Sequence, residues 1–156
     1  GTHDLPTLKG FWEGRDIDWR ERLGLYPDQK KHATDREERE KLKAELLHRL
    51  DAEGLLVHGI DPMQPPKFLP WSLVEAFHRF LFRTPAVLKA IQLEDALGAI
   101  EQANLPGTID EHPNWRRKIS VPLEKLSAEQ RLSALLRLFA ETSDESSTIQ
   151  TGFRSS

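Results

Sequence analysis

The segment TDREEREKLKAELLHRLDAEG, residues 34–54, decides the helical character of this 156-residue chain. Charges of opposite sign lie one turn apart on one of its faces, which is typical of a solvated helix surface. The other face carries leucines at helical intervals: Leu42, Leu46, Leu47 and Leu50. Thr34 and Glu37 have the spacing of a capping box. We therefore expect a helix that begins near Thr34 and stops at Gly54.

Helices are also predicted on both sides of this segment. Gly14 and Gly24 interrupt the stretch after residue 5, which indicates two short helices. Ser72 opens a second capping box, and an apolar face continues to about Arg83. Ser127 begins the last predicted helix by the same capping pattern.

Irregular structure is expected at two places. Four prolines, each of which fixes its own backbone angle, fall within residues 59–70 and predict an irregular connection. Residues 143–156 are rich in Ser, Thr, Asp and Glu and predict a disordered tail. The ordered domain is therefore expected to cover residues 1–142.

Residues 86–93, AVLKAIQL, are the one segment that does not suggest a helix. They form a short apolar run between Pro85 and the acidic pair Glu94 and Asp95. A short apolar run bounded in this way favours a buried strand.

Composition excludes several classes of function. The net charge is −3 and the pI about 6.1, so no broad cationic field is present to attract nucleic acid or an anionic membrane. There is no cysteine and no apolar run near the length of a membrane span, which favours a cytoplasmic protein. The six histidines show no metal-ligand spacing, so no metal is expected.

Two segments place polar and aromatic groups beside rigid Pro and Gly, as active-site loops do: GTHDLPTL at residues 1–8, and NLPGT at residues 104–108 with NWRR at residues 114–117. Taken alone, Asp4 is either a helix N-cap or a site carboxylate. Asn104 is either a turn residue or an amide that binds paired hydroxyls. Trp115 could stack on a sugar ring or anchor the packing of the loop.

These two segments, in this order, resemble signature segments of the 4-α-glucanotransferases, also called amylomaltases or disproportionating enzymes. The resemblance covers almost the whole chain. It implies a retaining transferase built on a (β/α)8 TIM barrel, a fold that needs about 250 residues. The resemblance therefore implies a mainly α fragment of such a barrel, its last strands and C-terminal helices, with residues 86–93 as the last strand.

The resemblance also assigns roles to residues. Retaining glycosidases need a nucleophile and a general acid/base, and further carboxylates can bond sugar hydroxyls as charge develops. Asp4 matches the family's transition-state stabiliser, His3 a histidine that bonds a hydroxyl of the same glucose, and Asn104 a donor-site asparagine. Arg116 and Arg117 are expected to pair with Glu94 or Asp95 as scaffold. The nucleophile and acid/base would lie upstream.

The function implied is transfer of an α-1,4-glucan segment to the 4-hydroxyl of an acceptor glucan or glucose. Its partners would be maltooligosaccharides and the N-terminal part of the same barrel, without a metal or organic cofactor. The isolated chain is expected to be inactive. Two alternatives are a non-catalytic helical binding module and a related α-glucan hydrolase.

Overall fold

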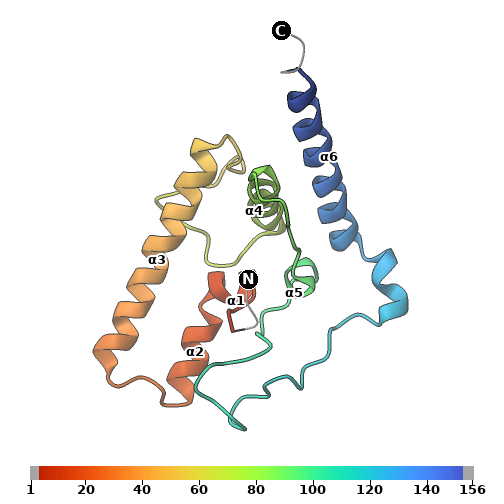
Figure 1. The fold of residues 1–156 in the computed structure, drawn as a ribbon. Coiled ribbons are helices and arrows are strands. Elements are labelled where there is room, and N and C mark those ends of the chain that lie inside the picture. The colour runs from red at the N-terminus through yellow and green to blue at the C-terminus, as the bar shows by residue number, and fades with distance from the viewer. Residues whose placement is uncertain (1–3, 153–156) are drawn as a thin grey trace.

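The computed structural model describes the backbone of residues 4–152 and the side chains of residues 4–141. The described residues are helical, with long irregular connections (Figure 1). The α-helices are α1 (Leu8–Glu13), α2 (Arg15–Arg22), α3 (Gln29–Ala52), α4 (Trp71–Arg83), α5 (Leu93–Ala96) and α6 (Gln130–Gly152), and a 3-10 helix, η1, covers Leu123–Ala128. In Figure 1, α3 and α6 stand at opposite sides of the molecule with α4 between them.

Two short helices, α1 and α2, occur where Gly14 and Gly24 predict them, so that prediction is confirmed. Thr7 is the N-cap of α1, and its Oγ1 accepts a hydrogen bond of 2.9 Å from the N–H of Gly10. Gly14 separates α1 from α2 with a left-handed φ of 73°, which glycine adopts without a steric penalty. The helix therefore begins later than Asp4, and Asp4 is not its cap.

The long helix α3 begins earlier than the capping box at Thr34 predicts, so that predicted start is wrong. Asp28 is the N-cap, and its Oδ1 accepts from the N–H of Lys31 at 2.7 Å. Inside the helix, the carboxylate of Asp35 pairs with Lys31 at 2.6 Å. The predicted end is confirmed, because Gly54 follows the helix with a φ of 66°.

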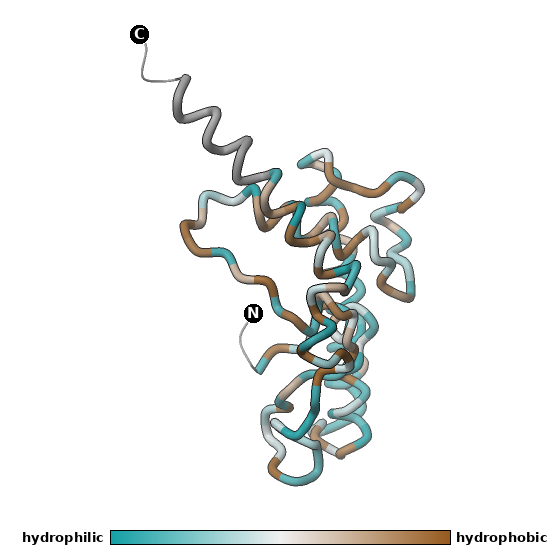
Figure 2. The backbone as a smooth tube through the Cα atoms, turned by 90° about the vertical axis from the view of Figure 1, so that its right-hand side faces the viewer, coloured by the Kyte–Doolittle hydropathy of each residue, from teal (hydrophilic) through white to brown (hydrophobic). Residues whose placement is uncertain are grey.

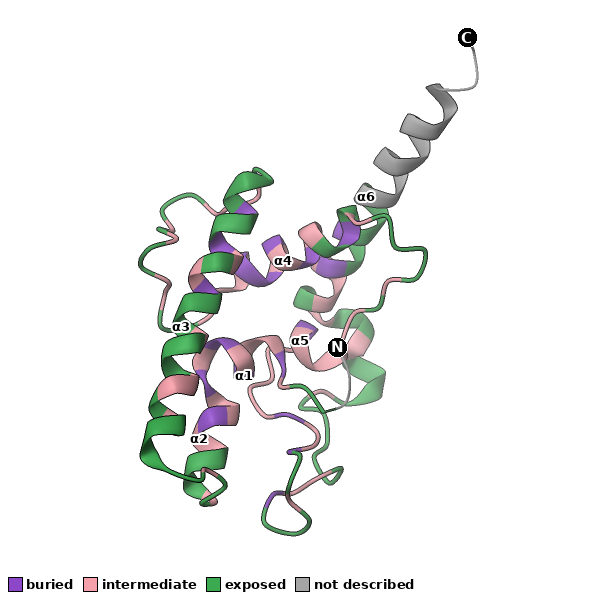
Figure 3. Ribbon diagram, turned by 60° about the vertical axis from the view of Figure 1, so that its left-hand side comes forward, coloured by how far each residue is buried: buried purple, intermediate pink, exposed green. Residues whose placement is uncertain are grey.

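Helix α4 is the centre of the packing. It ends at Arg83 as predicted, although Pro70 precedes it and the side chain of Ser72 does not cap it. One buried cluster joins α4 to α1 and α3: Trp12, Leu47, Leu50, Leu73 and Ala76. A second joins it to α5 and α6: Phe82, Ala96, Leu135 and Leu138. Figure 3 shows buried stretches along α4, whereas most of α3 is exposed.

The predicted buried strand at residues 86–93 is wrong. No strand occurs among residues 4–152, and residues 85–92 form an irregular connection before α5. Val87 is fully exposed and Leu88 is 89% exposed. A strand needs a neighbour to pair its backbone N–H and C=O groups, and none lies beside this segment. Hydrophobic residues accordingly occur in the irregular segments as well as in the helices (Figure 2).

The C-terminal region differs from its prediction at the start of the last helix. Ser127 lies within η1, and α6 begins at Gln130. The predicted tail, residues 143–156, overlaps the end of α6, and residues 153–156 lie outside the described part of the chain, so disorder there stays a prediction. Among the helices described, none has the length and apolar character needed to cross a bilayer.

Candidate functional site

The structure brings together two of the three predicted site residues. Asn104 donates a hydrogen bond of 2.6 Å from its side-chain Nδ2 to Oδ1 of Asp4, across 100 residues of sequence. Asp4 is exposed and Asn104 is partly buried. His3, the third predicted residue, lies outside the described residues. An exposed carboxylate beside an amide can accept and donate hydrogen bonds to neighbouring hydroxyls of one sugar ring.

The segment after Asp4 is fixed by the region around α5. The backbone N–H of Leu8 donates to Oδ1 of Asp95 at 2.6 Å, and the hydroxyl of Thr7 donates to the carbonyl of Ala99 at 2.7 Å. Burial raises the pKa of the Asp95 carboxyl, although the hydrogen bond from Leu8 opposes that shift. Asp95 thus has the scaffold role predicted for it, through a backbone contact.

The segment that leads to Asn104 is fixed by charged groups on α2. Oε1 of Glu101 accepts from Nε and Nη2 of Arg15 at 2.8 and 2.5 Å, and Oε2 accepts from the indole of Trp19 at 2.7 Å. Arg117 adds a longer ion pair of 3.6 Å. Burial of Glu101 opposes its ionisation, but the hydrogen bonds from Arg15 and Trp19 outweigh it and lower the pKa of the carboxyl.

The arginine partners predicted from the sequence are wrong. Arg116 pairs with Asp110 at 2.9 Å, and Arg117 pairs with Glu101 and not with Glu94 or Asp95. Both arginines lie on the segment that turns back beside residues 101–104, so the acidic groups nearest to them come from that loop. Trp115 is 61% exposed and has a left-handed φ of 60°, which is uncommon for a residue with a side chain.

Sequence reasoning missed two residues that shape the loop. Oδ1 of Asn114 accepts from the N–H of Leu105 at 2.9 Å and lies 2.8 Å from Nδ1 of His112. The imidazole of His112 is fully buried, with its ring edge-on to Trp19. The available signal in the sequence was the pair of polar residues, His112 and Asn114, on the two sides of Pro113.

A hollow of about 560 Å³ lies beside this loop. Its lining includes Leu97, Glu101, Ala103 and Arg117, but neither Asp4 nor Asn104. Within residues 4–141, no group of three or more acidic or histidine side chains is arranged to hold a metal ion.

Comparison with known proteins identifies the family. A family model described as 4-alpha-glucanotransferase matches residues 1–124. The 4-alpha-glucanotransferase of Mycobacterium bovis is 36% identical over 142 residues, which cover 86% of this chain and 18% of that protein. The 4-alpha-glucanotransferase of Haemophilus influenzae is 30% identical over 142 residues, covering 85% and 19%.

A solved structure agrees with these matches. The crystal structure of amylomaltase from Corynebacterium glutamicum aligns with a TM-score of 0.75 at 30% identity, over 89% of this chain and 21% of that one. The chain belongs to the 4-alpha-glucanotransferase family. It spans about a fifth of the length of these relatives.

Proposed function

We propose that this chain forms the C-terminal part of a longer (β/α)8-barrel enzyme that transfers segments of α-1,4-glucans. Upstream carboxylates would act as nucleophile and acid/base, and the glucosyl chain would pass to the 4-hydroxyl of an acceptor. Transfer instead of hydrolysis requires the acceptor sugar to outcompete water at the covalent intermediate. Alone, the chain would be inactive, because it lacks both of those carboxylates.

The observation that supports this proposal is the hydrogen bond of 2.6 Å between Asn104 and Asp4. These residues come from separate motifs at opposite ends of the family match, and independent turn or capping roles would not require them to meet. Thr7, and not Asp4, caps α1, which removes the simplest structural role for that carboxylate.

In the proposed site, Asp4 accepts hydrogen bonds from the ring hydroxyls beside the anomeric carbon. Such contacts tighten as the sugar becomes oxocarbenium-like, so they stabilise the transition state more than the bound substrate. Asn104 orients Asp4 and offers its own amide to the donor sugar. His3, the residue before Asp4, would bond a hydroxyl of the same glucose.

The test is an assay of the complete enzyme on maltotriose, in which glucose and longer maltodextrins are measured together. We expect both products from the wild type, and a loss of about 10²- to 10⁴-fold in kcat for Asp4→Asn, because interactions worth several kcal/mol are removed from the transition state. Asp110→Asn, on an exposed loop carboxylate paired with Arg116, is the control and should retain activity.

Three results would count against the proposal. Near-normal turnover by a folded Asp4→Asn enzyme would remove the stabiliser role. Glucose with only shorter products would indicate the hydrolase alternative. Binding of glucan by the complete protein without any turnover would favour a non-catalytic binding module.

A further inference from the structure

The loop that carries Asn104 is held by the side chain of Asn114. Its Oδ1 accepts from the backbone N–H of Leu105, the residue next to Asn104, at 2.9 Å. Its Nδ2 donates to Oγ1 and to the carbonyl of Thr108 at 2.8 and 3.2 Å. Since a backbone N–H can only donate, the amide oxygen must face Leu105 and the amide nitrogen must face Thr108. The orientation of Asn114 is therefore fixed.

This orientation determines the hydrogen position on His112. Nδ1 of the imidazole lies 2.8 Å from the same Oδ1. Because that oxygen is an acceptor, Nδ1 must carry the hydrogen. The other ring nitrogen, Nε2, is the buried side-chain polar atom that has no hydrogen-bond partner among the described residues. A buried polar atom without a partner is costly, so its presence calls for a reason.

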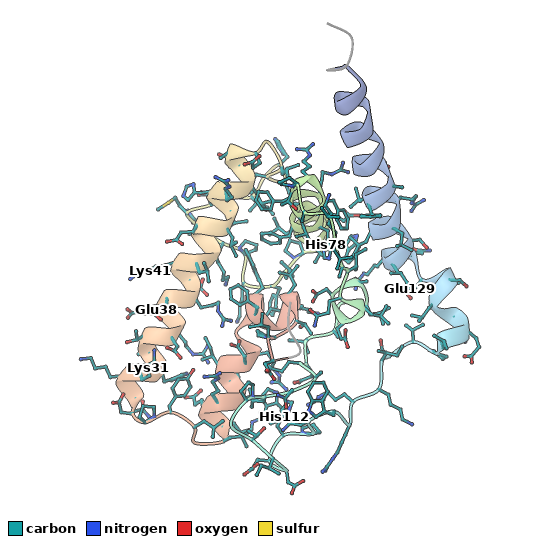
Figure 4. All side chains as sticks on the ribbon, viewed as in Figure 1. Lys31, Glu38, Lys41, His78, His112 and Glu129 are labelled. Carbon is teal, nitrogen blue, oxygen red and sulfur yellow. The ribbon has the colours of Figure 1, made fainter. Side chains whose placement is uncertain are left out.

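The imidazole is held in place from α2. The ring of Trp19 meets it edge-on at 5.0 Å between centroids, and the indole N–H of Trp19 is bonded to Glu101. Figure 4 shows His112 beside the end of α2, among the side chains that join this helix to the loop. The contacts run from α2 through Trp19 and His112 to Asn114, and from there to the backbone beside Asn104.

We infer that His112 is a positioning residue for Asn104: through its Nδ1–H it orients the amide of Asn114, which holds the backbone at Leu105. This inference rests on the proposed function of Asn104. If His112 only filled space, its ring volume would matter and its Nδ1–H would not. Two substitutions separate these roles. His112→Asn keeps an N–H donor at the position of Nδ1, whereas His112→Phe keeps the ring and removes the donor.

The first test needs no variant and no activity. Nitrogen-15 NMR of the imidazole in the wild-type chain should show that Nδ1 of His112 carries a hydrogen. An Nε2–H tautomer would overturn the inference, because its Nδ1 has no hydrogen to donate to Oδ1 of Asn114.

The second test is a double-mutant cycle in the complete enzyme, with kcat and KM measured on maltotriose. We expect His112→Phe to lower kcat/KM by about tenfold, the size of one lost hydrogen bond, and His112→Asn by less than about threefold. In an Asn104→Ala background, His112→Phe should have almost no further effect, because both act through one group. His58→Phe, at an exposed histidine, is the matched control.

The outcomes separate this inference from the proposed function. No transfer by the wild type, or full activity of Asn104→Ala, would defeat the function and the site. With Asn104→Ala impaired, additive effects in the cycle, or a greater loss with His112→Asn than with His112→Phe, would defeat the role of His112 alone. If His112→Phe does not fold, the imidazole tautomer of the wild type and the activity of His112→Asn still test the role of His112.

Discussion

The two segments that meet at the site are fastened in different ways. The segment after Asp4 is held by close backbone packing and by neutral donors, with Leu8 bonded to the partly buried Asp95. The loop that carries Asn104 is held by charge, with Glu101 between Arg15 and Trp19. Burial is the main cause at Asp95 and raises its pKa. Burial also opposes ionisation of Glu101, but the hydrogen bonds from Arg15 and Trp19, together with the nearby arginine charges, outweigh it and lower the pKa of Glu101. The contributions of these two carboxylates to folding stability should therefore change with pH in opposite directions.

This comparison indicates that the two segments should be sensitive to different kinds of substitution. A small steric change should loosen the Asp4 segment, and a change of charge should loosen the Asn104 loop. Three predictions test this division, in order of decreasing effect.

The largest effect is expected from Gly10→Ala. A Cβ at this position would lie 2.4 Å from the backbone carbonyl oxygen of Ile100, which cannot move without displacing its segment. Although Ala normally stabilises a helix, overpacking should lower the free energy of unfolding by about 2–3 kcal/mol. Denaturant unfolding of the chain followed by circular dichroism would measure it.

Gly24→Ala is the control for Gly10→Ala. Gly24 has a φ of 65° with nothing within 4 Å of an added Cβ, so only backbone strain of about 1 kcal/mol is expected. Equal losses in the two variants would mean that the contact with Ile100 is not the constraint.

The second prediction concerns Glu101→Gln. The amide keeps one acceptor oxygen but loses the charge shared with Arg15 and Arg117, so we expect a loss of about 2 kcal/mol. The matched control is Asp110→Asn, whose partner Arg116 is mostly exposed and whose pair should contribute less than about 1 kcal/mol. A similar loss in both variants would show that Glu101 acts as an ordinary surface charge. Unfolding in urea would compare them.

The smallest effect is the pH dependence of the two carboxylates. The pKa of Asp95 is raised above 3.8 on folding. The contribution of Asp95 to stability is therefore present at low pH and is lost as pH rises from 3.8 through the raised pKa of the folded state. The pKa of Glu101 is lowered below 4.5, so its contribution is present above that value and is lost as pH falls. The signs are therefore opposite.

We would measure the unfolding of wild type, Asp95→Asn and Glu101→Gln at about pH 6.5 and about pH 3. Relative to wild type, Asp95→Asn should gain stability on going to the higher pH, because the amide does not ionise, whereas ionisation of Asp95 destabilises the folded wild type. Glu101→Gln should lose stability over the same interval. Parallel behaviour of the two variants would contradict the assigned pKa directions.

Much of the helical fold could be predicted from local sequence. Gly14, Gly54 and Arg83 mark boundaries where predicted and observed elements agree. The start of α3 could not be read from its best capping box, because Asp28 offers an earlier cap and the residues between are good helix formers. The apolar run at residues 86–93 suggested a strand because local hydrophobicity does not reveal whether a neighbouring strand is present.

The candidate site likewise contains residues that the sequence could predict and residues that it could not. Asp4 and Asn104 could be proposed because each stands in a recognisable motif. The roles of Glu101, His112 and Asn114 could not, although Asn114 belongs to the quoted NWRR segment, because these roles depend on contacts with Arg15, Trp19 and Leu105 that local spacing does not specify. The partners of Arg116 and Arg117 were misassigned for the same reason, since the turn of the loop decides which acid is nearest.

The contact between Asp4 and Asn104 also has a consequence for folding order. It joins two residues that lie 100 apart in the sequence, so a long loop has to close before it can form. Helices α1 to α4 must shorten that loop before the two side chains can meet, so we expect the site to assemble after the helices. In a refolding experiment, the helical signal should therefore return before the contact between Asp4 and Asn104 forms.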